Sequence, residues 1–163
     1  MQKTGRLELT WVGKYDNKDI EPRILIEDKE KSYGDKSSKN MLIHGDNLIA
    51  LQALQQDFAG KIKCIYIDPP YNTGSVFEHY DDDLEHSQWL NIMRPRLQLL
   101  HNLLQENGFF CCEIDDSEGQ YLKVLLDEIF GRSNYLTTIY IQVRYPDKTL
   151  KEDMKFQACF KIA

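Results

Sequence analysis

Apolar and polar residues alternate in two different periods along most of the chain. Short apolar runs predict strands at about residues 41–44, 62–67, 109–114 and 136–143. Between these runs, leucines recur three or four residues apart, which predicts helices over 47–58 and from Ser87 towards Leu104. A third helix is expected after Ser117, with Gly131 as its stop. Strands that alternate with helices predict an α/β fold with a mostly parallel sheet, covered by helices on both faces.

The first 40 residues do not follow this pattern. Residues 7–12 and the segment EPRILIED alternate like two short strands, whereas the stretch after them is almost entirely charged, Gly or Ser. We therefore divide the chain into an N-terminal arm (1–28), a flexible linker (29–40) that is poorly ordered over 29–39, and a folded body (41–163). The chain stops at KIA in what looks like the middle of an element. The body is thus expected to be a truncated, N-terminal part of a larger domain.

Polar residues stand where helix N-caps are expected, namely at Asp46 or Asn47, at Ser87, and at Asp115, Asp116 and Ser117. Asp115 and Asp116 also end a predicted strand, but capping is the preferred interpretation for them. Pro95 lies inside the second helical pattern, and Gly108 follows that pattern as its expected end. Because proline removes a helical hydrogen bond, Pro95 is expected to kink or split the helix.

Composition places the chain among ordinary globular proteins. Apolar residues make up 42% of the 163 residues and charged residues 28%, which excludes collagen-like and disordered classes. No apolar run is long enough to span a membrane, and the N-terminus lacks the apolar core of a signal peptide, so a cytoplasmic location is expected. Trp11 and Trp89 are interpreted as core anchors.

The cysteines and histidines give no indication of a metal site. Without CxxC spacing, the four cysteines are interpreted as buried thiols: Cys64, Cys111, Cys112 and Cys159. His79 and His86 lie beside acidic residues, but their loose spacing on a charged loop favours solvated side chains. We therefore expect no bound metal.

The formal net charge of −6 argues by itself against a nucleic-acid surface. Residues 1–40 hold nine Lys/Arg against eight Asp/Glu, whereas residues 41–163 hold eleven against eighteen. The acidity thus belongs to the folded body. A nucleic-acid partner would have to be held by a local basic patch or by sequence outside this chain.

One motif carries most of the chemistry. The residues Asp68-Pro69-Pro70-Tyr71 follow directly after the apolar run IKCIYI. Ligands of open α/β sheets collect at the carboxyl ends of strands, where this motif is expected to lie. Two prolines fix the turn, so that the Asp68 carboxylate and the Pro69 carbonyl can point at one place, with the Tyr71 ring beside them. This arrangement suits a planar aromatic substrate with an NH2 group, although a bare Asp-Pro-Pro could also be a simple strand-ending turn.

The extended motif DPPYNTG resembles the catalytic motif of the amino-group DNA methyltransferases, in the permuted (beta-type) order that places it near the N-terminus. The segments LELTWVGK, EPRILIED, LIHGDNLIALQAL, SVFEHYDDDLEHSQWLNIMRPRL and EIDDSEGQYLKVLLDEIFG resemble the modification (Mod) subunits of type III restriction-modification systems. The resemblance extends to about Arg144 and is weakest in the last twenty residues. It implies a partial Rossmann-like S-adenosylmethionine-dependent methyltransferase fold.

The resemblance also implies a reaction. An adenine is flipped out of double-stranded DNA, its N6 amine is held by Asp68 and the Pro69 carbonyl, and its ring stacks on Tyr71. Three residues, Asn72, Thr73 and Gly74, shape the loop around the base. The methyl group comes from S-adenosylmethionine. Full-length relatives of this kind are expected to form homodimers and to pair with a restriction (helicase or nuclease) subunit.

For the cofactor, the resemblance points to Asp46, which would lie near its adenosine, although a helix N-cap is an equally good interpretation of this residue. The glycine loop that holds the cofactor in this family is absent from the chain, so the chain alone is expected to be inactive. Two alternatives stay open. Cytosine-N4 methylation is usually associated with Ser in place of Asp68, and a non-catalytic interaction subunit would not need an intact motif.

Overall fold

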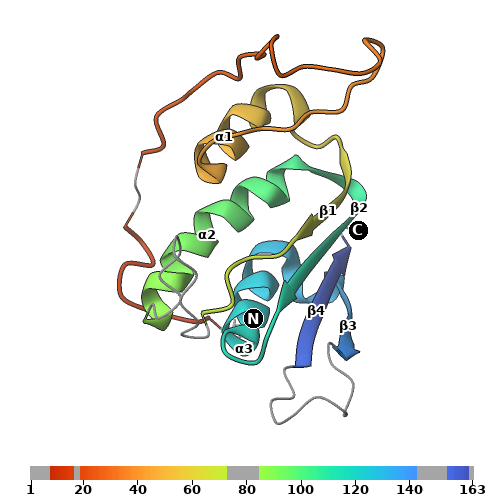
Figure 1. Ribbon diagram of the computed structural model, residues 1–163. Coiled ribbons are helices and arrows are strands. Elements are labelled where there is room, and N and C mark those ends of the chain that lie inside the picture. The colour runs from red at the N-terminus through yellow and green to blue at the C-terminus, as the bar shows by residue number, and fades with distance from the viewer. Residues whose placement is uncertain (1–7, 17–18, 73–84, 143–153, 162–163) are drawn as a thin grey trace, which may run out of the picture.

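The computed structural model describes residues 8–16, 19–72, 85–142 and 154–161. From α1 to β3, helices and strands follow one another in the order predicted (Figure 1). The elements are α1 (Asn47–Phe58), β1 (Ile62–Ile67), α2 (His86–Leu103), β2 (Leu104–Ile114), α3 (Gly119–Leu126), the π-helical turn η1 (Asp127–Gly131), the 3₁₀ turn η2 (Arg132–Asn134), β3 (Tyr135–Gln142) and β4 (Met154–Lys161).

The described strands form a four-stranded sheet in the order β1-β2-β4-β3. β1 and β2 are parallel, and β4 is antiparallel to both of its neighbours, β2 and β3. Three of the four strands therefore run in one direction, which confirms the α/β fold with a mostly parallel sheet. The sequence analysis did not predict β4, which inserts between β2 and β3 and separates two strands that follow each other in the chain.

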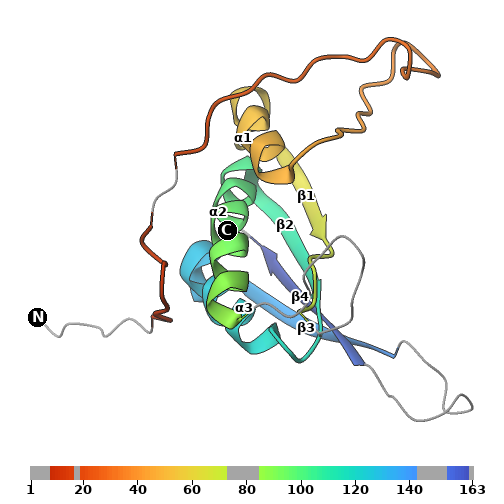
Figure 2. The same ribbon diagram turned by 60° about the vertical axis from the view of Figure 1, so that its left-hand side comes forward.

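Helices α2 and α3 lie on the same side of the sheet in both views (Figures 1 and 2). Within the described residues the other face carries exposed apolar side chains: Tyr66 is 55% exposed, Phe109 45% and Ile139 46%. Cys64 is the register partner of Phe109 and is likewise exposed, so its interpretation as a buried thiol was wrong. The expectation of helices on both faces is also wrong for the part of the chain that is described.

The core lies between α2 and the covered face of the sheet. The buried residues of α2 are Trp89, Leu90, Met93, Leu97, Leu100 and Leu103. They belong to one cluster with Phe110, Cys112 and Ile114 of β2 and with Leu122, Leu125 and Leu126 of α3. Burial raises the pKa of the Cys112 thiol, which keeps this cysteine protonated and inert.

Pro95 lies in the middle of α2, yet the helix continues through it from His86 to Leu103. The lost hydrogen bond and ring clash cost about 3 kcal/mol in a helix interior. Each fully buried large apolar side chain contributes about 1.5–3 kcal/mol, and α2 buries six of them. Packing therefore outweighs the proline, and the expected split of the helix does not occur.

Only one of the predicted N-caps has the expected geometry. The Asp46 side chain accepts hydrogen bonds from the backbone N–H groups of Leu48 (2.9 Å) and Ile49 (3.2 Å) at the start of α1. Glu85 caps α2 by accepting from the N–H of Ser87, so the prediction for Ser87 itself was wrong. The Glu85 side chain thus binds an N–H group in the first turn of α2, two residues further along the chain.

The cap prediction at the start of α3 was also wrong. Asp115 Oδ1 accepts from the N–H of Ser117 at 2.9 Å, which closes a turn before the helix. The N-cap of α3 is Glu118, whose side chain makes no capping hydrogen bond. This carboxylate is used elsewhere, as described below.

β2 begins at Leu104, directly after α2, and therefore earlier than the predicted start at residue 109. The register is irregular here, since Ile62 pairs with Leu104 but Cys64 pairs with Phe109. At Gly108 a Cβ atom would lie 2.9 Å from the Gln105 carbonyl oxygen and 3.1 Å from that of Ile62. Gly108 is thus a close-approach residue inside a strand and does not end the helix.

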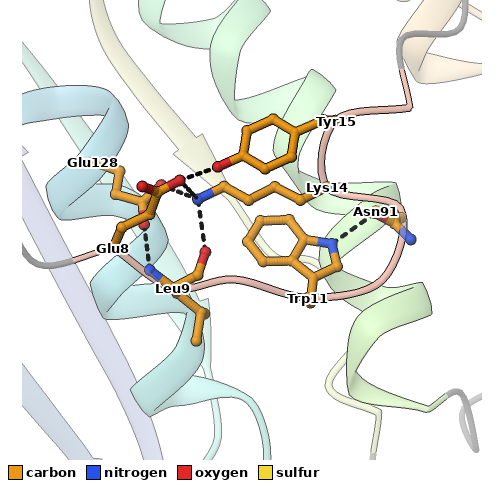
Figure 3. Close-up of polar contacts among 7 residues, drawn as sticks. All are labelled: Glu8, Leu9, Trp11, Lys14, Tyr15, Asn91 and Glu128. Carbon is orange, nitrogen blue, oxygen red and sulfur yellow. Dashed lines mark hydrogen bonds and ion pairs between the residues drawn. The ribbon is translucent and has the colours of Figure 1, made fainter.

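Residues 8–15 of the N-terminal arm pack on the helices, and the arm forms no strand in its described part (Figure 3). Leu9 and Trp11 pack against the core cluster, whereas Glu8, Thr10 and Val12 are exposed. The alternation that suggested a strand over 7–12 therefore reflects an extended segment lying on helices. Trp11 Nε1 donates to Asn91 Oδ1 of α2 at 2.6 Å, which fixes the arm to that helix.

A buried lysine completes this contact (Figure 3). Lys14 Nζ donates to Glu8 Oε1 (2.9 Å), to Glu128 Oε2 (2.9 Å) and to the Leu9 carbonyl (2.6 Å), so its three N–H groups have three acceptors. The Lys14 side chain is only 3% exposed and that of Glu128 12%. Glu128 also accepts from the Leu9 N–H at 2.7 Å, which ties the arm to η1.

Two other predicted strands are absent. Residues 41–44 and the segment EPRILIED have no strand assignment, and Leu42 is fully exposed at 100%. An extended segment needs a neighbouring strand to pair with, and none lies beside these two within the described residues. Residues 29–40 are exposed and contain no helix or strand. Their poor order stays a prediction.

Candidate active site

The motif begins at the carboxyl end of β1, as the sequence predicts. Asp68 follows the last residue of β1, and Ile67 pairs in register with Cys112 of the parallel strand β2. The carboxyl ends of these two strands are therefore side by side, and Glu113 follows Cys112 at the same edge. Thr73 and Gly74 lie outside the described residues, as does His79.

Tyr71 connects two carboxylates across this edge. Its hydroxyl donates to Asp68 Oδ1 at 2.5 Å, and Glu113 Oε2 lies 3.3 Å from the same hydroxyl. Burial, followed by the hydrogen bond and the negative charge of Asp68, raises the pKa of Tyr71 well above its ordinary value. The phenol therefore stays protonated. The hydrogen bond from Tyr71 thus fixes the position of the Asp68 carboxylate. Sequence reasoning missed Glu113, the second carboxylate near the Tyr71 hydroxyl.

The second proline is anchored from α2. Trp89 is 1% exposed, and its Nε1 donates to the Pro70 carbonyl at 2.8 Å. This confirms Trp89 as a core anchor and gives it a second task in holding the turn. Among the described residues, no donor to the Pro69 carbonyl is found.

The end of the described turn is held by Glu118, which sequence reasoning did not select. Asn72 Nδ2 donates to Glu118 Oε1 at 2.6 Å, and His86 Nδ1 lies 2.7 Å from the same oxygen. Glu118 is completely buried, at 0% exposure. The interpretation of His86 as a solvated side chain is wrong in part, because one ring nitrogen bonds a buried carboxylate although the side chain is 53% exposed. Glu118 directly follows Asp115, Asp116 and Ser117, the polar residues after β2 for which capping was the preferred interpretation.

Asp46 is the residue that the sequence analysis assigned to the cofactor. It caps α1, and its Oδ2 is 3.8 Å from Arg96 of α2. Its side chain is 55% exposed, so the carboxylate is accessible while it caps the helix. Among the described residues, the bonds of Asp46 reach α1 and α2 and none reaches the motif.

A cavity of about 870 Å³ lies between the N-terminal arm and α2, lined among others by Lys14, Arg94 and Arg96. Asp68, Pro69, Pro70, Tyr71 and Asn72, the described residues of the motif, do not line it. Among the described residues, no three His, Cys, Asp or Glu side chains are grouped closely enough to hold a metal ion. No helix in the described ranges is long and apolar enough to cross a membrane.

The chain is similar to known proteins over most of its length. Residues 62–159 match the N6/N4 family described as DNA methylase. The Mod subunit of the type III restriction-modification enzyme StyLTI of Salmonella typhimurium is 37% identical over 149 residues, covering 74% of this chain. The Mod subunit of EcoPI, from Escherichia phage P1, is 34% identical over 167 residues and covers 80% of the chain.

These two relatives are much longer proteins. The chain spans 22% of the StyLTI subunit and 26% of the EcoPI subunit, which is about a quarter of their length. Among solved structures, that of a DNA modification methylase from Thermus thermophilus, complexed with S-adenosyl-L-methionine, aligns with a TM-score of 0.51. It is 15% identical, and the alignment covers 72% of this chain and 53% of that chain, which indicates a shared fold.

Proposed function

Because the chain belongs to the N6/N4 DNA methylase family, we propose that it supplies the base-binding turn of a site-specific adenine-N6 DNA methyltransferase of a restriction-modification system. The observation that carries the proposal is the pair of acceptors at the carboxyl end of β1. Asp68 and Pro69 are consecutive residues on a turn that Trp89 holds at Pro70, and we propose that the carboxylate and carbonyl oxygens of these two residues point at one place. An exocyclic NH2 group has two hydrogens for these two oxygens.

The proposed role of the turn is to prepare a poor nucleophile. Conjugation with the adenine ring withdraws the N6 lone pair, and hydrogen bonds from N6 to Asp68 and Pro69 would localise it for in-line attack. With the cofactor bound, N6 would form a bond to the methyl carbon as the carbon–sulfur bond breaks, the neutral thioether would leave, and the proton lost by N6 would pass to water. The negative charge of Asp68 stabilises the positive charge that grows on nitrogen before that proton leaves.

S-adenosylmethionine, when bound, supplies the methyl group. The residues present fit one end of its site, because the Asp46 carboxylate is accessible at the N-terminus of α1 while one of its oxygens caps the helix. We propose that Asp46 lies near the adenosine of the cofactor. The glycine loop expected for the remainder of this site is not in the sequence.

The isolated chain is therefore expected to bind S-adenosylmethionine weakly or not at all and to transfer no methyl group, since it holds the turn without the glycine loop. Isothermal titration calorimetry on the 163-residue chain measures this directly. Tight binding in the low-micromolar range would mean that the cofactor site has been assigned to the wrong residues.

A flipped base would stack on the Tyr71 ring, and Asn72, Thr73 and Gly74 would shape the loop around it. To reach Asp68, the amine must share the carboxylate with the Tyr71 hydroxyl, which donates to it in the free chain. Glu113 lies 3.3 Å from that hydroxyl and offers a second acceptor for it.

Substitution of Tyr71 by alanine should weaken retention of the flipped base by about 1–3 kcal/mol, the scale of base–aromatic stacking. Tyr71→Phe keeps the ring face and should have a mild effect. Fluorescence of a 2-aminopurine at the target position reports flipping in each variant of the full-length protein. Equal losses for Tyr71→Ala and Tyr71→Phe would contradict stacking and assign the effect to the hydroxyl.

We extend the proposal to the rest of the protein. Since the chain spans about a quarter of the Mod subunits it matches, we propose that it is the N-terminal, catalytic-motif part of a longer protein (41–163 after the arm and linker). Its net charge of −6 suits a DNA-binding surface located mainly in other segments. We propose duplex DNA as substrate, a cytoplasmic location, a homodimer, and a restriction subunit as partner.

The experiment that tests this function is transfer of a labelled methyl group from S-adenosylmethionine to duplex DNA by the full-length protein. We expect incorporation of label at specific sites. A folded full-length protein that incorporates none would favour a non-catalytic interaction subunit and overturn the proposal.

A further inference from the structure

We propose that Glu118 is a positioning residue for methyl transfer: its buried carboxylate holds Asn72 and His86 and thereby fixes the turn that carries Asp68 and Pro69. The inference rests on the proposed function, because it concerns the geometry of the same turn. It adds a residue at the start of α3 to a site otherwise built from β1, β2 and α2.

Glu118 contacts both the turn after β1 and the start of α2. Its Oε1 accepts from Asn72 Nδ2 at 2.6 Å and lies 2.7 Å from His86 Nδ1. Asn72 is the fifth residue of the motif, and His86 is the first residue of α2. One oxygen therefore ties together the turn after β1 and the start of α2, from a position at the start of α3.

The energetics of this carboxylate do not suit a purely structural residue. Glu118 is 0% exposed, and its second oxygen, Oε2, is buried with no hydrogen-bond partner among the described residues. Removing a carboxylate from water is unfavourable, and a half-satisfied one is less favourable than an apolar side chain of the same size. Stability alone would therefore favour leucine or methionine at this position. Residues that break such a rule are concentrated at functional sites.

The backbone of Asn72 lies in the left-handed region, with φ +60°, which Asn adopts more readily than most other non-glycine residues. The hydrogen bond to Glu118 holds this conformation through the side chain. Tyr71, the preceding residue, bonds Asp68, so a shift of Asn72 displaces the ring and the carboxylate together.

Two anchors thus fix the turn from different helices. Trp89 of α2 holds the Pro70 carbonyl, and Glu118 at the start of α3 holds the Asn72 side chain. Asp68 and Pro69, whose oxygens are proposed to receive the amine, directly precede Pro70. Preorganised acceptors lose much of their effect when they move by about 1 Å, which can lower a rate by about 10²-fold.

The test is a set of variants in the full-length protein, compared by steady-state and single-turnover methyl transfer. Glu118→Gln keeps one acceptor oxygen and the shape of the side chain, and should lower kcat by about 10-fold. Glu118→Ala removes both acceptors and should lower it by about 10²-fold. KM for DNA should change by a smaller factor than kcat, because Glu118 itself does not touch the substrate. Glu106→Gln, at an exposed position of β2, is the matched control and should keep the wild-type kcat.

Reversing the direction of the Asn72–Glu118 hydrogen bond distinguishes a positioning role of Glu118 from a general structural role. Asn72→Asp alone places two carboxylates together and should strongly lower kcat. Adding Glu118→Gln lets the new amide donate to the new carboxylate, so the second substitution should raise kcat in this background while it lowers kcat in the wild type. Rates are taken per folded molecule, with the folded fraction from urea titration. This pair keeps side-chain size, so it serves even where Glu118→Ala does not fold.

The outcomes are distinct. Wild-type kcat in Glu118→Gln and Glu118→Ala, or a double variant no faster than Asn72→Asp alone, would overturn the role of Glu118 while methyl transfer by the wild type upholds the proposed function. A wild-type protein that transfers no methyl group overturns the proposed function and this inference with it.

Discussion

Replacing Asp68 with asparagine in the full-length protein is expected to slow single-turnover methyl transfer by about 10²–10³-fold, the effect of losing one preorganised transition-state interaction. Asparagine keeps one acceptor oxygen in nearly the same place but carries no negative charge. The loss therefore measures the charge that stabilises the cation developing on N6. Asp68→Ala, which removes both the acceptor and the charge, should abolish measurable transfer.

Both variants should keep the fold and the affinity for DNA, because Asp68 lies outside the core cluster and its side-chain hydrogen bond is to Tyr71. Asp57→Asn, at an exposed position near the end of α1, is the matched control and should transfer methyl groups at the wild-type rate. If Asp68→Asn works at nearly the wild-type rate, the carboxylate charge has no part in the chemistry and the proposed mechanism is wrong.

Lys14→Ala is expected to lower the free energy of unfolding by about 3 kcal/mol, because removing one partner of a buried ion pair leaves the other charge uncompensated. Glu128, 12% exposed, would lose its ammonium partner, and the arm would lose the lysine that joins Glu8 and the Leu9 carbonyl. Urea unfolding of the 163-residue chain, followed by tryptophan fluorescence, reports this loss, since Trp11 lies in the same contact.

The double variant Lys14→Met with Glu128→Met is the control. Two apolar side chains of similar length replace both charges, and most of the lost stability should return. A double variant as unstable as Lys14→Ala would show that the packing of the arm, and not an uncompensated charge, sets the loss.

The same ion pair predicts a pH dependence. Burial lowers the pKa of Lys14, but its hydrogen bonds to Glu128 and Glu8 raise it by more, and the net pKa lies above the ordinary 10.5. A raised folded-state pKa means that the ion pair stabilises the fold fully below pH 10.5 and is lost as the pH rises through the folded-state value. In the Lys14→Met, Glu128→Met variant, this alkaline loss of stability should disappear.

Periodicity predicted the folded body well and the peripheral segments poorly. The three helices and the strands β1, β2 and β3 lie close to the predicted positions, because each has an apolar face that packs in one core. The segment 41–44 shows the limit of such reasoning. Its apolar residues have strand character, but a strand exists only where a neighbour supplies hydrogen bonds, and nothing local in a sequence reports that neighbour.

Part of the candidate site could be predicted from the sequence, and part could not. The motif could be found because Asp68, Pro69, Pro70 and Tyr71 are contiguous, and the strand before them predicts their place at the sheet edge. Glu118 and Glu113 could not be selected, because they reach the motif from 46 and 42 residues away in the chain. Glu118 was not considered, because the capping interpretation ended at Ser117, the residue before it. Only the packing of α3 beside the turn reveals its contact with Asn72.

The most direct test of the central claim is the identity of the methylated base. Duplex DNA is incubated with the full-length protein and S-adenosylmethionine carrying a deuterated methyl group, then digested to nucleosides and measured by mass spectrometry. Our account predicts deuterated N6-methyladenine as the product, and its loss in Asp68→Ala. Deuterated N4-methylcytosine, or a digest without any labelled base, would contradict it.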